Sequence, residues 1–576
     1  MSLEQELNKA RSLEKKGAIL EAINIYKSIL TVFPKNIRVQ ERLAALSKPK
    51  KINNLHPSQE DIDKLIKLLN QRHYSSVVDQ AKVFIREYPN TPILWSIMGI
   101  SAAQLGMFDK SEMALRKSLA LDPNNDKNHD NLGNVLREQK KFVEAIEAHS
   151  KAISINPNNY LAYFNMGITF KQNGKLNHAI KAYKKSILIK PDYIEAYCNM
   201  GIIFMEQGKL YKSLELYKDS ILINQNVSIL HNNIGNVFKD LGNLGEAIKA
   251  FKKAISLKAD YGEAYYNLSF IYNLKGDLQK GLQLYEWRLK KDRCPTRIPR
   301  DHLVWDGKES LLDKKFFVYE EQGLGDIIQF CRYLPLLKQK GAEVIFKVKP
   351  KMHSLIKTLD EDIILVDNDP DENSIDFEAP LMSLPYLFNT NLDSIPSRTS
   401  YISVDQNRII SWKKHLAKDS FKVGICWQGS KTKIDFGRSF PLTLFKDISK
   451  LSNVELISLH KGEGEKQIED INFDLTVLGN DFDNGEDAFI DSAAVMANCD
   501  LIITSDTAIA HLAGALGCRT WVVLKKIPDW RWMLDRNDSP WYPNMKLYRQ
   551  KERDNWEEVF ETIKKDLESL IDLNEN

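Results

Sequence analysis

The chain has 576 residues, several times the roughly 100–200 residues of a usual domain, so the sequence predicts more than one hydrophobic core. With 43% hydrophobic and 27% charged residues its composition is that of an ordinary globular protein, and a net charge of +3 is too small to indicate nucleic acid as a partner. The 6 cysteines are scattered without CxxC pairs, which argues against a zinc site and against a disulfide framework.

Two stretches bear on targeting. Residues 1–22 are charged and amphipathic and lack the apolar core of a secretory signal. The most apolar later window, residues 501–524, is interrupted by Asp506, His511 and Arg519, whereas a membrane-spanning helix needs about 20 largely uncharged residues. We therefore expect a cytoplasmic protein without a transmembrane segment.

Small residues recur at a fixed spacing through the first half of the chain. One series is Gly99, Gly133, Gly167, Gly201 and Gly235, with Ser269 at the next position. A second series is Gly106, Gly174, Gly208, Gly242 and Gly276, with Lys140 in place of one glycine, and a third is Pro89, Pro123, Pro157 and Pro191. Each unit carries two amphipathic stretches around a glycine turn, which predicts a repeated pair of helices.

This pattern is similar to the tetratricopeptide repeat (TPR), which has the same period of about 34 residues. The resemblance covers residues 58–290, and a related helical unit is expected at 1–48, with a linker at 46–58. It implies an α-helical TPR solenoid whose concave groove binds a peptide or another protein.

Asparagine recurs on the first helix of successive units, and two interpretations of the row are open. The row consists of Asn131, Asn165, Asn199, Asn233 and Asn267, with Asn134, Asn232 and Asn236 beside it. Amides facing the groove would bond a peptide backbone without reading its sequence, in the way of the asparagine ladders of O-GlcNAc transferases, which this row resembles. The alternative is that these asparagines are polar surface residues.

After the repeats, strand, turn and helix patterns begin. Residues 313–405 and 420–572 alternate short apolar runs with amphipathic stretches, which predicts two α/β domains with a cleft between them. The amphipathic segment 554–573 is expected to pack across from the second domain to the first. The glycine turn "GLGD" (323–326) and the triplet "SDT" (505–507) each follow a predicted strand, where backbone amides at a helix start can hold phosphate.

Residues 313–550 resemble the ADP-heptose heptosyltransferases of glycosyltransferase family 9, through "QGLGDIIQFCRYLPLL" and "SDTAIAHLAGALG". The resemblance implies the GT-B fold of two facing Rossmann-like domains, and metal-independent, inverting transfer from a nucleotide-sugar donor without a cofactor. Asp326 matches the family's catalytic acid, in a loop with Gly323 and Gly325. Ala508 stands where the family has glycine, so the donor cannot be carried over from the family.

The resemblance also implies roles for the second motif. Its residues Ser505, Asp506, Thr507, Ala508 and His511 would contact the donor sugar and diphosphate, with Asp506 at the helix cap and His511 leaning toward the cleft. Inverting transfer needs a base for the acceptor proton, which is the role expected of Asp326. The structural alternatives are that Asp326 caps the following helix, and that Asp506 and His511 are an N-cap and a satisfied buried histidine.

Basic residues follow the first strand of the second domain. Arg438 is the preferred partner of the departing diphosphate because its planar fork holds two oxygens at once, and Lys431 is the substitute. Ser430 and Lys433 lie in the same loop, and a solvated basic loop is the alternative interpretation. Glu463 matches a position that bonds the nucleotide ribose in the family.

Aromatic residues are dense near the end of the second domain, at Trp530, Trp532, Trp541 and Tyr542. Such rings either stack on sugar and base faces or build a local core, and density favours the core. No cluster with metal-ligand spacing is visible in the sequence.

Taken together, the sequence predicts an inverting, metal-independent glycosyltransferase whose TPR array recruits a protein acceptor or partner. Two alternatives are open. One is a TPR interaction scaffold with an inactive glycosyltransferase-like domain, an interpretation that Ala508 supports. The other is heptosyltransferase-like transfer to a glycan acceptor, for which the repeats would have little use.

Overall fold

The computed structural model describes residues 3–15, 18–47, 57–291, 297–429, 437–485 and 487–575. The chain forms two compact units, Met1–Ala196 and Tyr197–Asn576. The division falls inside α12 (Ile194–Glu206), in the middle of the repeats. The domain limits 1–48, 58–290, 313–405 and 420–572 drawn from the sequence stay predictions.

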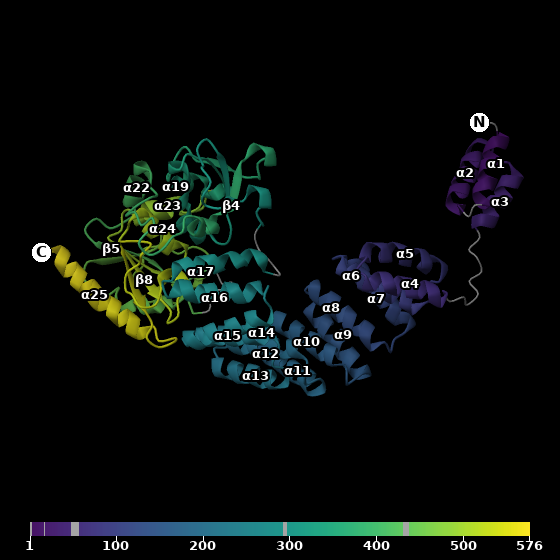
Figure 1. Ribbon diagram of the computed structural model, residues 1–576, viewed down its shortest axis with the longest axis horizontal. Helices are drawn as coiled ribbons and strands as arrows, with labels where there is room; N and C mark the ends of the chain where they lie inside the picture. The colour runs from purple at the N-terminus through teal and green to yellow at the C-terminus, as the bar shows by residue number, and fades with distance from the viewer. Residues whose placement is uncertain are drawn as a thin grey trace. The chain divides into compact units, whose positions relative to one another are not determined.

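The first unit consists of helices, most of them in antiparallel pairs such as α6 with α7 and α8 with α9 (Figure 1). Their bounds are α1 (Leu3–Lys15), α2 (Ile19–Val32), α3 (Ile37–Ser47), α4 (Gln59–Asn70), α5 (Tyr74–Glu87), α6 (Pro92–Gln104), α7 (Phe108–Leu121), α8 (Asp126–Glu138), α9 (Phe142–Ile155), α10 (Tyr160–Gln172) and α11 (Leu176–Ile189). The predicted array of helical pairs is therefore confirmed. The greater part of the predicted linker lies outside the described residues.

The recurrent glycines have two different physical reasons. A Cβ added at Gly167 would lie 2.5 Å from the Tyr183 ring, so the absence of a side chain lets the two helices of a pair approach closely. Gly174 instead ends α10 in a left-handed turn, with φ +73°. Lys140, which replaces glycine in that second series, adopts the same conformation with φ +62°.

The second unit begins with further helical pairs. Their bounds are α13 (Leu210–Ile223), α14 (Ser228–Asp240), α15 (Leu244–Leu257), α16 (Gly262–Leu274) and α17 (Leu278–Tyr285), followed by the 3₁₀ turn η1 (Glu286–Lys290).

A parallel sheet, here called sheet A, follows the repeats in the order β3-β2-β1-β4. Its strands are β1 (Lys315–Tyr319), β2 (Glu343–Lys347), β3 (Ile364–Val366) and β4 (Phe377–Pro380). The chain connects them through α18 (Leu324–Phe330), α19 (Leu334–Gln339), α20 (His353–Lys357) and the 3₁₀ turn η5 (Glu372–Ser374). After β4 it continues through the 3₁₀ turn η6 (Leu381–Ser383) and α21 (Leu384–Leu387). Parallel pairing runs through the sheet, for example Phe317 with Ile345 on β2 and with Glu378 on β4.

A second parallel sheet, sheet B, has the order β6-β5-β7-β8-β9. Its strands are β5 (Phe421–Cys426), β6 (Val454–Ser458), β7 (Leu501–Ser505), β8 (Thr520–Leu524) and β9 (Met545–Arg549). The associated helices are α22 (Gln406–Lys413), α23 (Ile490–Met496), α24 (Ala508–Leu516) and α25 (Glu557–Glu575).

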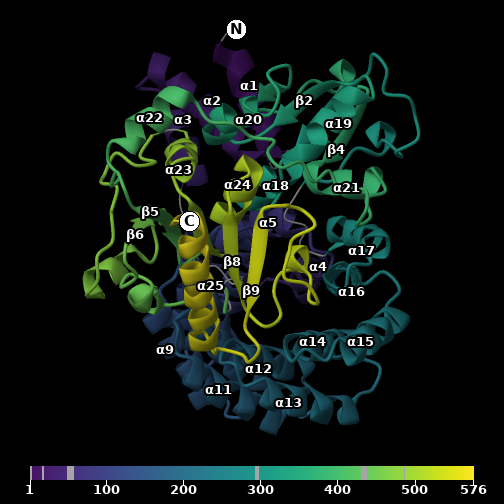
Figure 2. The same ribbon diagram turned by 90° about the vertical axis from the view of Figure 1, so that its left-hand side faces the viewer.

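The last helix lies against sheet B (Figure 2). Phe560, Ile563 and Leu567 of α25 pack in one cluster with Trp521 and Tyr548 of the sheet. The expectation that this segment crosses to the first α/β domain is therefore wrong. The apolar face of α25 matches the outer face of sheet B, whose alternate strand residues would otherwise be exposed.

A single hydrophobic core joins the last repeats to both sheets. It contains Leu278 and Tyr285 from α17, Phe316 from sheet A, and Ile502 and Leu547 from sheet B. Parallel α/β structure after the repeats is thus confirmed, and the final helical pair is built into its core.

Candidate active site

The order of the strands marks one place at the edge of each sheet. In sheet B the chain leaves β5 toward β6 on one side and returns to β7 on the other, so the loops after β5 and β7 diverge. In sheet A the loops after β1 and β4 diverge in the same way. Ligands of open parallel sheets bind in such crevices outside the carboxyl ends of the strands. Both sequence motifs, "GLGD" after β1 and "SDT" after β7, lie at these positions.

The first motif forms a tight turn into α18. Gln322 has φ +64°, and Gly323 is the N-cap of the helix. Asp326 Oδ2 accepts a 2.8 Å hydrogen bond from the Gly323 amide and closes a capping box. The capping alternative for Asp326 is therefore real, and it leaves the other carboxylate oxygen for a different partner.

The second motif caps its helix differently from the expectation. Thr507, with extended backbone angles, is the N-cap of α24, so the prediction of Asp506 as the cap is wrong. The reason is that a two-residue bend, Asp506 and Thr507, separates the end of β7 at Ser505 from the first helical residue Ala508, so that Thr507 is the residue next to the helix. The Thr507 side chain makes no capping hydrogen bond.

The two motifs meet. A Cβ added at Gly325 would lie 2.9 Å from Cδ2 of His511 and 3.3 Å from Cα of Ala508. Helices α18 and α24 therefore approach at their N-terminal ends, where Gly325 leaves room for the methyl group of Ala508. The side chain that departs from the family pattern faces the other motif directly.

His511 is a buried histidine with partners, which agrees with the structural alternative for this residue, and its ring faces Gly325 of the first motif. Its Nδ1 lies 3.0 Å from the Tyr542 hydroxyl, and its ring stacks on Trp532 with centroids 5.3 Å apart. Burial, together with the positive charges of Arg531 and Arg332, holds the pKa of His511 well below its usual value. The ring is therefore neutral at physiological pH.

A residue that the sequence analysis did not single out occupies the centre of the site. Arg531, in the 3₁₀ turn η9 (Trp530–Trp532), donates a 2.5 Å hydrogen bond to Asp326 Oδ1 and a 2.7 Å bond to Asp529. Its guanidinium lies over the rings of Phe330 and Trp530. In the sequence, Arg531 stands between two tryptophans, with an aspartate on either side of them. This local pattern equally suits an ion pair at the surface, so it does not indicate a functional arginine.

The acid partner of Arg531 has an altered pKa. Burial raises the pKa of Asp326, while the Arg531 guanidinium and the Gly323 amide act in the opposite direction. Each carboxylate oxygen accepts one hydrogen bond and has a second lone pair, so a further donor can still bond Asp326.

Polar atoms without partners gather at the crevice of sheet B. Ser505 Oγ, Asp506 Oδ2 and Gln428 Nε2 are buried and have no hydrogen-bond partner among the described residues. Burial raises the pKa of Asp506 and Asp529 adds to the effect, whereas the charge of Arg438 and the neighbouring Trp532 indole oppose it. Because buried polar groups in folded proteins are nearly always paired, such a group at a crevice indicates a ligand site.

Of the other residues predicted to bind the sugar donor, only Arg438 is found near the second motif among the described residues. Arg438 lies close enough to Asp506 and His511 for its charge to lower the pKa of both. Ser430, Lys431 and Lys433 lie outside the described residues. Glu463 is exposed in the loop after β6, where its carbonyl lies 2.6 Å from His460 Nε2.

The aromatic cluster forms core. Trp530, Trp532, Trp541 and Tyr542 are each at most 2% exposed, and Trp530 packs edge-on against Trp541. Trp532 and Tyr542 pack against His511, and Trp530 packs against Arg531. Because all four rings are buried, none has an open face for a sugar.

The asparagine row divides into two kinds of position. Asn165 donates to Asp130 at 2.8 Å, and Asn267 donates to Asn232 at 3.0 Å, so these amides link successive repeats. Asn131, Asn199 and Asn233 are half-buried. Asn165 and Asn267 thus have a structural role in the array, which sequence spacing does not reveal.

The last helical pair contributes to the site. The Gln322 amide donates a 2.6 Å hydrogen bond to the Tyr285 hydroxyl, and the Tyr285 ring packs against Trp530. Tyr266 of α16 lies near Asp529 and Arg531. Its burial raises its pKa, and the negative charge of Asp529 adds to this effect. One wall of the candidate site is therefore made of repeat residues.

No group of at least three His, Cys, Asp or Glu side chains in the described part of the chain is arranged to hold a metal ion. No helix there combines the length and apolar character needed to cross a bilayer.

Comparison with known proteins identifies the repeats. A family model described as TPR repeat matches residues 133–174, 169–208 and 235–276. Among curated proteins, the chain is similar to Protein FlbA of Caulobacter vibrioides (strain ATCC 19089 / CIP 103742 / CB 15), at 25% identity over 307 residues. That similarity covers 48% of this chain and spans half of the length of the relative (50%).

Among solved structures, the chain is similar to MamA protein, at 26% identity and a TM-score of 0.27, over 29% of this chain and 92% of that one. It is also similar to YrrB, described as a TPR protein with an unusual peptide-binding site, at 17% identity and a TM-score of 0.27. That similarity covers 32% of this chain and 96% of YrrB. The helical pairs within residues 133–208 and 235–276 are therefore TPR repeats.

Proposed function

We propose that the α/β part of this chain is an inverting, metal-independent glycosyltransferase with a GT-B arrangement, and that the repeats bind its protein acceptor or partner. A nucleotide sugar is the donor and no cofactor takes part. The observation that carries the proposal is the contact of the two motifs, which places a carboxylate of sheet A beside the end of sheet B that holds buried polar atoms without partners among the described residues.

The crevice of sheet B suits the donor. Asp506 Oδ2 would accept from a donor hydroxyl, and Ser505 Oγ and Gln428 Nε2 offer further bonds to a polar ligand. The amides at the start of α24, which the Thr507 side chain does not cap, favour an anion. Arg438 supplies a positive charge that suits a diphosphate.

Asp326 suits the base. It would take the proton of an acceptor hydroxyl as that oxygen attacks the anomeric carbon of the donor sugar. The bond from that carbon to the diphosphate then breaks, and the nucleoside diphosphate departs with the electron pair, which inverts the anomeric centre. A carboxylate whose pKa burial raises is a stronger base than a free one, and Arg531 holds its orientation.

The test is release of nucleoside diphosphate by the full chain, with UDP-N-acetylglucosamine, UDP-glucose, GDP-mannose and ADP-heptose offered in turn. We expect turnover with one of them and a fall of roughly 100-fold or more in kcat for Asp326→Asn. Asp360 pairs with Lys338 of α19 at 2.8 Å and belongs to neither motif, so Asp360→Asn is the control and should keep full activity. Turnover that Asp326→Asn leaves undiminished would remove the mechanism.

A second candidate function is a protein-binding scaffold. It is favoured by the Ala508 methyl group in the contact between the two motifs and by the engagement of both Asp326 oxygens. Absence of both binding and turnover across the donor panel, with capture of a partner by the intact chain, would favour this function over the enzyme. Transfer to a glycan without any need for the repeats would instead support the glycan-acceptor alternative.

A further inference from the structure

The 3₁₀ turn η1, which ends the repeats, carries a buried arginine that reaches the edge of sheet A. Arg288 Nε donates to Glu321 Oε2 at 3.0 Å and its terminal nitrogen donates to Glu321 Oε1 at 2.6 Å. The Arg288 side chain is 4% exposed and that of Glu321 is 1% exposed. Glu321 belongs to the loop that leads from β1 into Gly323 and Asp326.

The same arginine is linked to the loop after β4. It donates to Ser383 Oγ at 2.8 Å and to Glu286 at 2.5 Å, and Ser383 in turn donates to Glu286 at 2.7 Å. The backbone amide of Met382 donates to Glu321 at 3.1 Å. One network therefore ties the end of the repeats to both loops that diverge at the crevice of sheet A.

We propose that Arg288 is a positioning residue for the Asp326 loop, and that the last repeat thereby sets the geometry of the reacting carboxylate. This inference rests on the proposed function. A bidentate pair in a dry environment fixes both distance and angle, which a single charge on a flexible chain does not. The Tyr285 hydroxyl, which accepts from Gln322, holds the next residue of the same loop.

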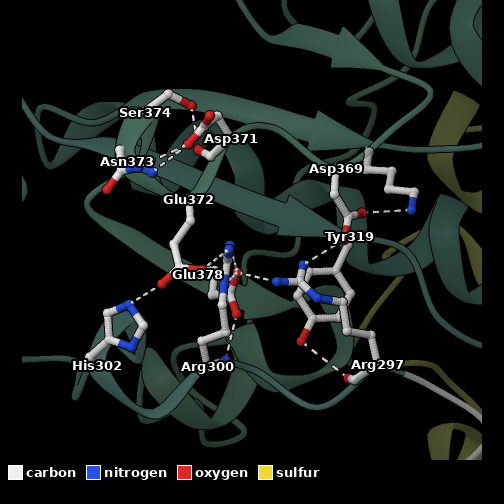
Figure 3. A network of polar contacts seen from close by, with 11 residues as sticks. Arg297, Arg300, His302, Tyr319, Asp369, Asp371, Glu372, Asn373, Ser374 and Glu378 are labelled. Carbon is white, nitrogen blue, oxygen red and sulfur yellow. Dashed lines mark hydrogen bonds and ion pairs between the residues drawn. The ribbon is translucent and has the colours of Figure 1, made fainter.

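The structure offers a matched control (Figure 3). Arg300 forms an ion pair with the buried Glu378 of β4, at 2.6 Å, and also bonds Glu372; its own side chain is 26% exposed. Arg297 pairs with Glu378 as well, so Glu378 keeps a partner when Arg300 is replaced. Loss of Arg300 therefore also removes an arginine–carboxylate pair at sheet A, but one that holds β4 and not the loop that carries Asp326.

The experiment compares Arg288→Lys and Arg300→Lys in the full chain. Lysine keeps the positive charge, so both variants should fold, but it cannot hold a carboxylate with two parallel bonds. Hydrogen exchange is followed at the Gly323, Asp326 and Ile327 amides, which are bonded within the turn. We expect exchange roughly tenfold faster or more at these amides in Arg288→Lys and no change there in Arg300→Lys.

Kinetics and donor binding complete the test. We expect kcat of Arg288→Lys to fall about tenfold or more while the Kd of the donor stays unchanged, because the donor binds at sheet B. Unchanged exchange in Arg288→Lys, equal acceleration in Arg300→Lys, or faster exchange with full kcat would each overturn the inference. If the unaltered chain binds and turns over no nucleotide sugar, the proposed function fails, and the exchange arm still decides whether Arg288 holds the loop.

Discussion

The Arg531 guanidinium is hydrogen-bonded to the Asp326 carboxylate at 2.5 Å, although the two residues are 205 positions apart in the chain. The Arg531 side chain is 8% exposed and also forms an ion pair with Asp529, so one guanidinium pairs with two carboxylates where the two motifs meet. The bond connects the loop after β8 to the loop after β1. It therefore determines both the orientation of Asp326 and the contact of the two α/β parts.

Replacement of Arg531 by Met leaves Asp326 and Asp529, whose side chains are 19% and 29% exposed, without their cationic partner. We expect a loss of about 1.5–3 kcal/mol in the free energy of unfolding, measured by urea titration. Arg536→Met, which breaks an ion pair with the exposed Asp538, should cost about 1 kcal/mol or less. Equal losses in the two variants would contradict the central place of Arg531.

The neutral state of His511 predicts a pH dependence of stability. Its pKa in the folded protein is depressed, so the stability it contributes is present above its unfolded pKa of about 6.5 and is lost as the pH falls. Between pH 7.5 and pH 5.5 we expect His511 to account for a loss of about 1.4 kcal/mol. Urea unfolding of the parent chain and of His511→Phe at both pH values isolates this difference, and identical pH slopes would contradict it.

Two glycines in the same half of the array predict opposite effects of an added methyl group. In Gly201→Ala the new Cβ would collide with the Tyr217 ring, so we expect a loss of about 1–3 kcal/mol. In Gly245→Ala the Cβ meets no atom within 4 Å, and the helix gains up to about 1 kcal/mol from the better helix former. Thermal unfolding of both variants checks the sign, and a neutral Gly201→Ala would show that the helices can separate.

Truncation tests the shared core. Residues 191–576 keep α12 to α17, and this fragment should retain the cooperative unfolding of the α/β part. Removal of residues 1–290 deletes Leu274, Leu278, Leu282 and Tyr285, each buried in the common core and each contributing about 1.5–3 kcal/mol. We expect that shorter fragment to lose cooperative unfolding in circular dichroism, whereas independent folding would contradict a core shared by the repeats and the α/β part.

The repeats were predictable because their signals are local. A glycine that admits an aromatic ring, as Gly167 admits Tyr183, and a left-handed turn at Gly174 recur at fixed spacing, and the chain needs no distant partner to reveal them. The strands of both sheets were predictable for the same reason, from short apolar runs bounded by turns.

The centre of the site was only partly predictable. Asp506 lies directly after β7, and Asp326 lies in the first turn of the helix that follows β1, so their position at the carboxyl ends of the strands follows from parallel topology. Arg288 and Arg531 act through partners 33 and 205 positions away, and periodicity carries no information about such pairs. The capping by Thr507 in place of Asp506 shows the same limit on a small scale, since the sequence does not reveal that a two-residue bend separates β7 from α24.

The most direct test of the account is calorimetric titration of the full chain with each nucleotide sugar of the panel, beside Asp506→Asn. Asp506→Asn keeps the volume of the side chain and removes the charge whose Oδ2 has no partner among the described residues. We expect one donor to bind the parent chain, with affinity falling about tenfold or more in Asp506→Asn and unchanged in Asp360→Asn. Binding of equal strength to the parent and to Asp506→Asn would contradict the site, and no binding of any donor would contradict the proposed enzyme.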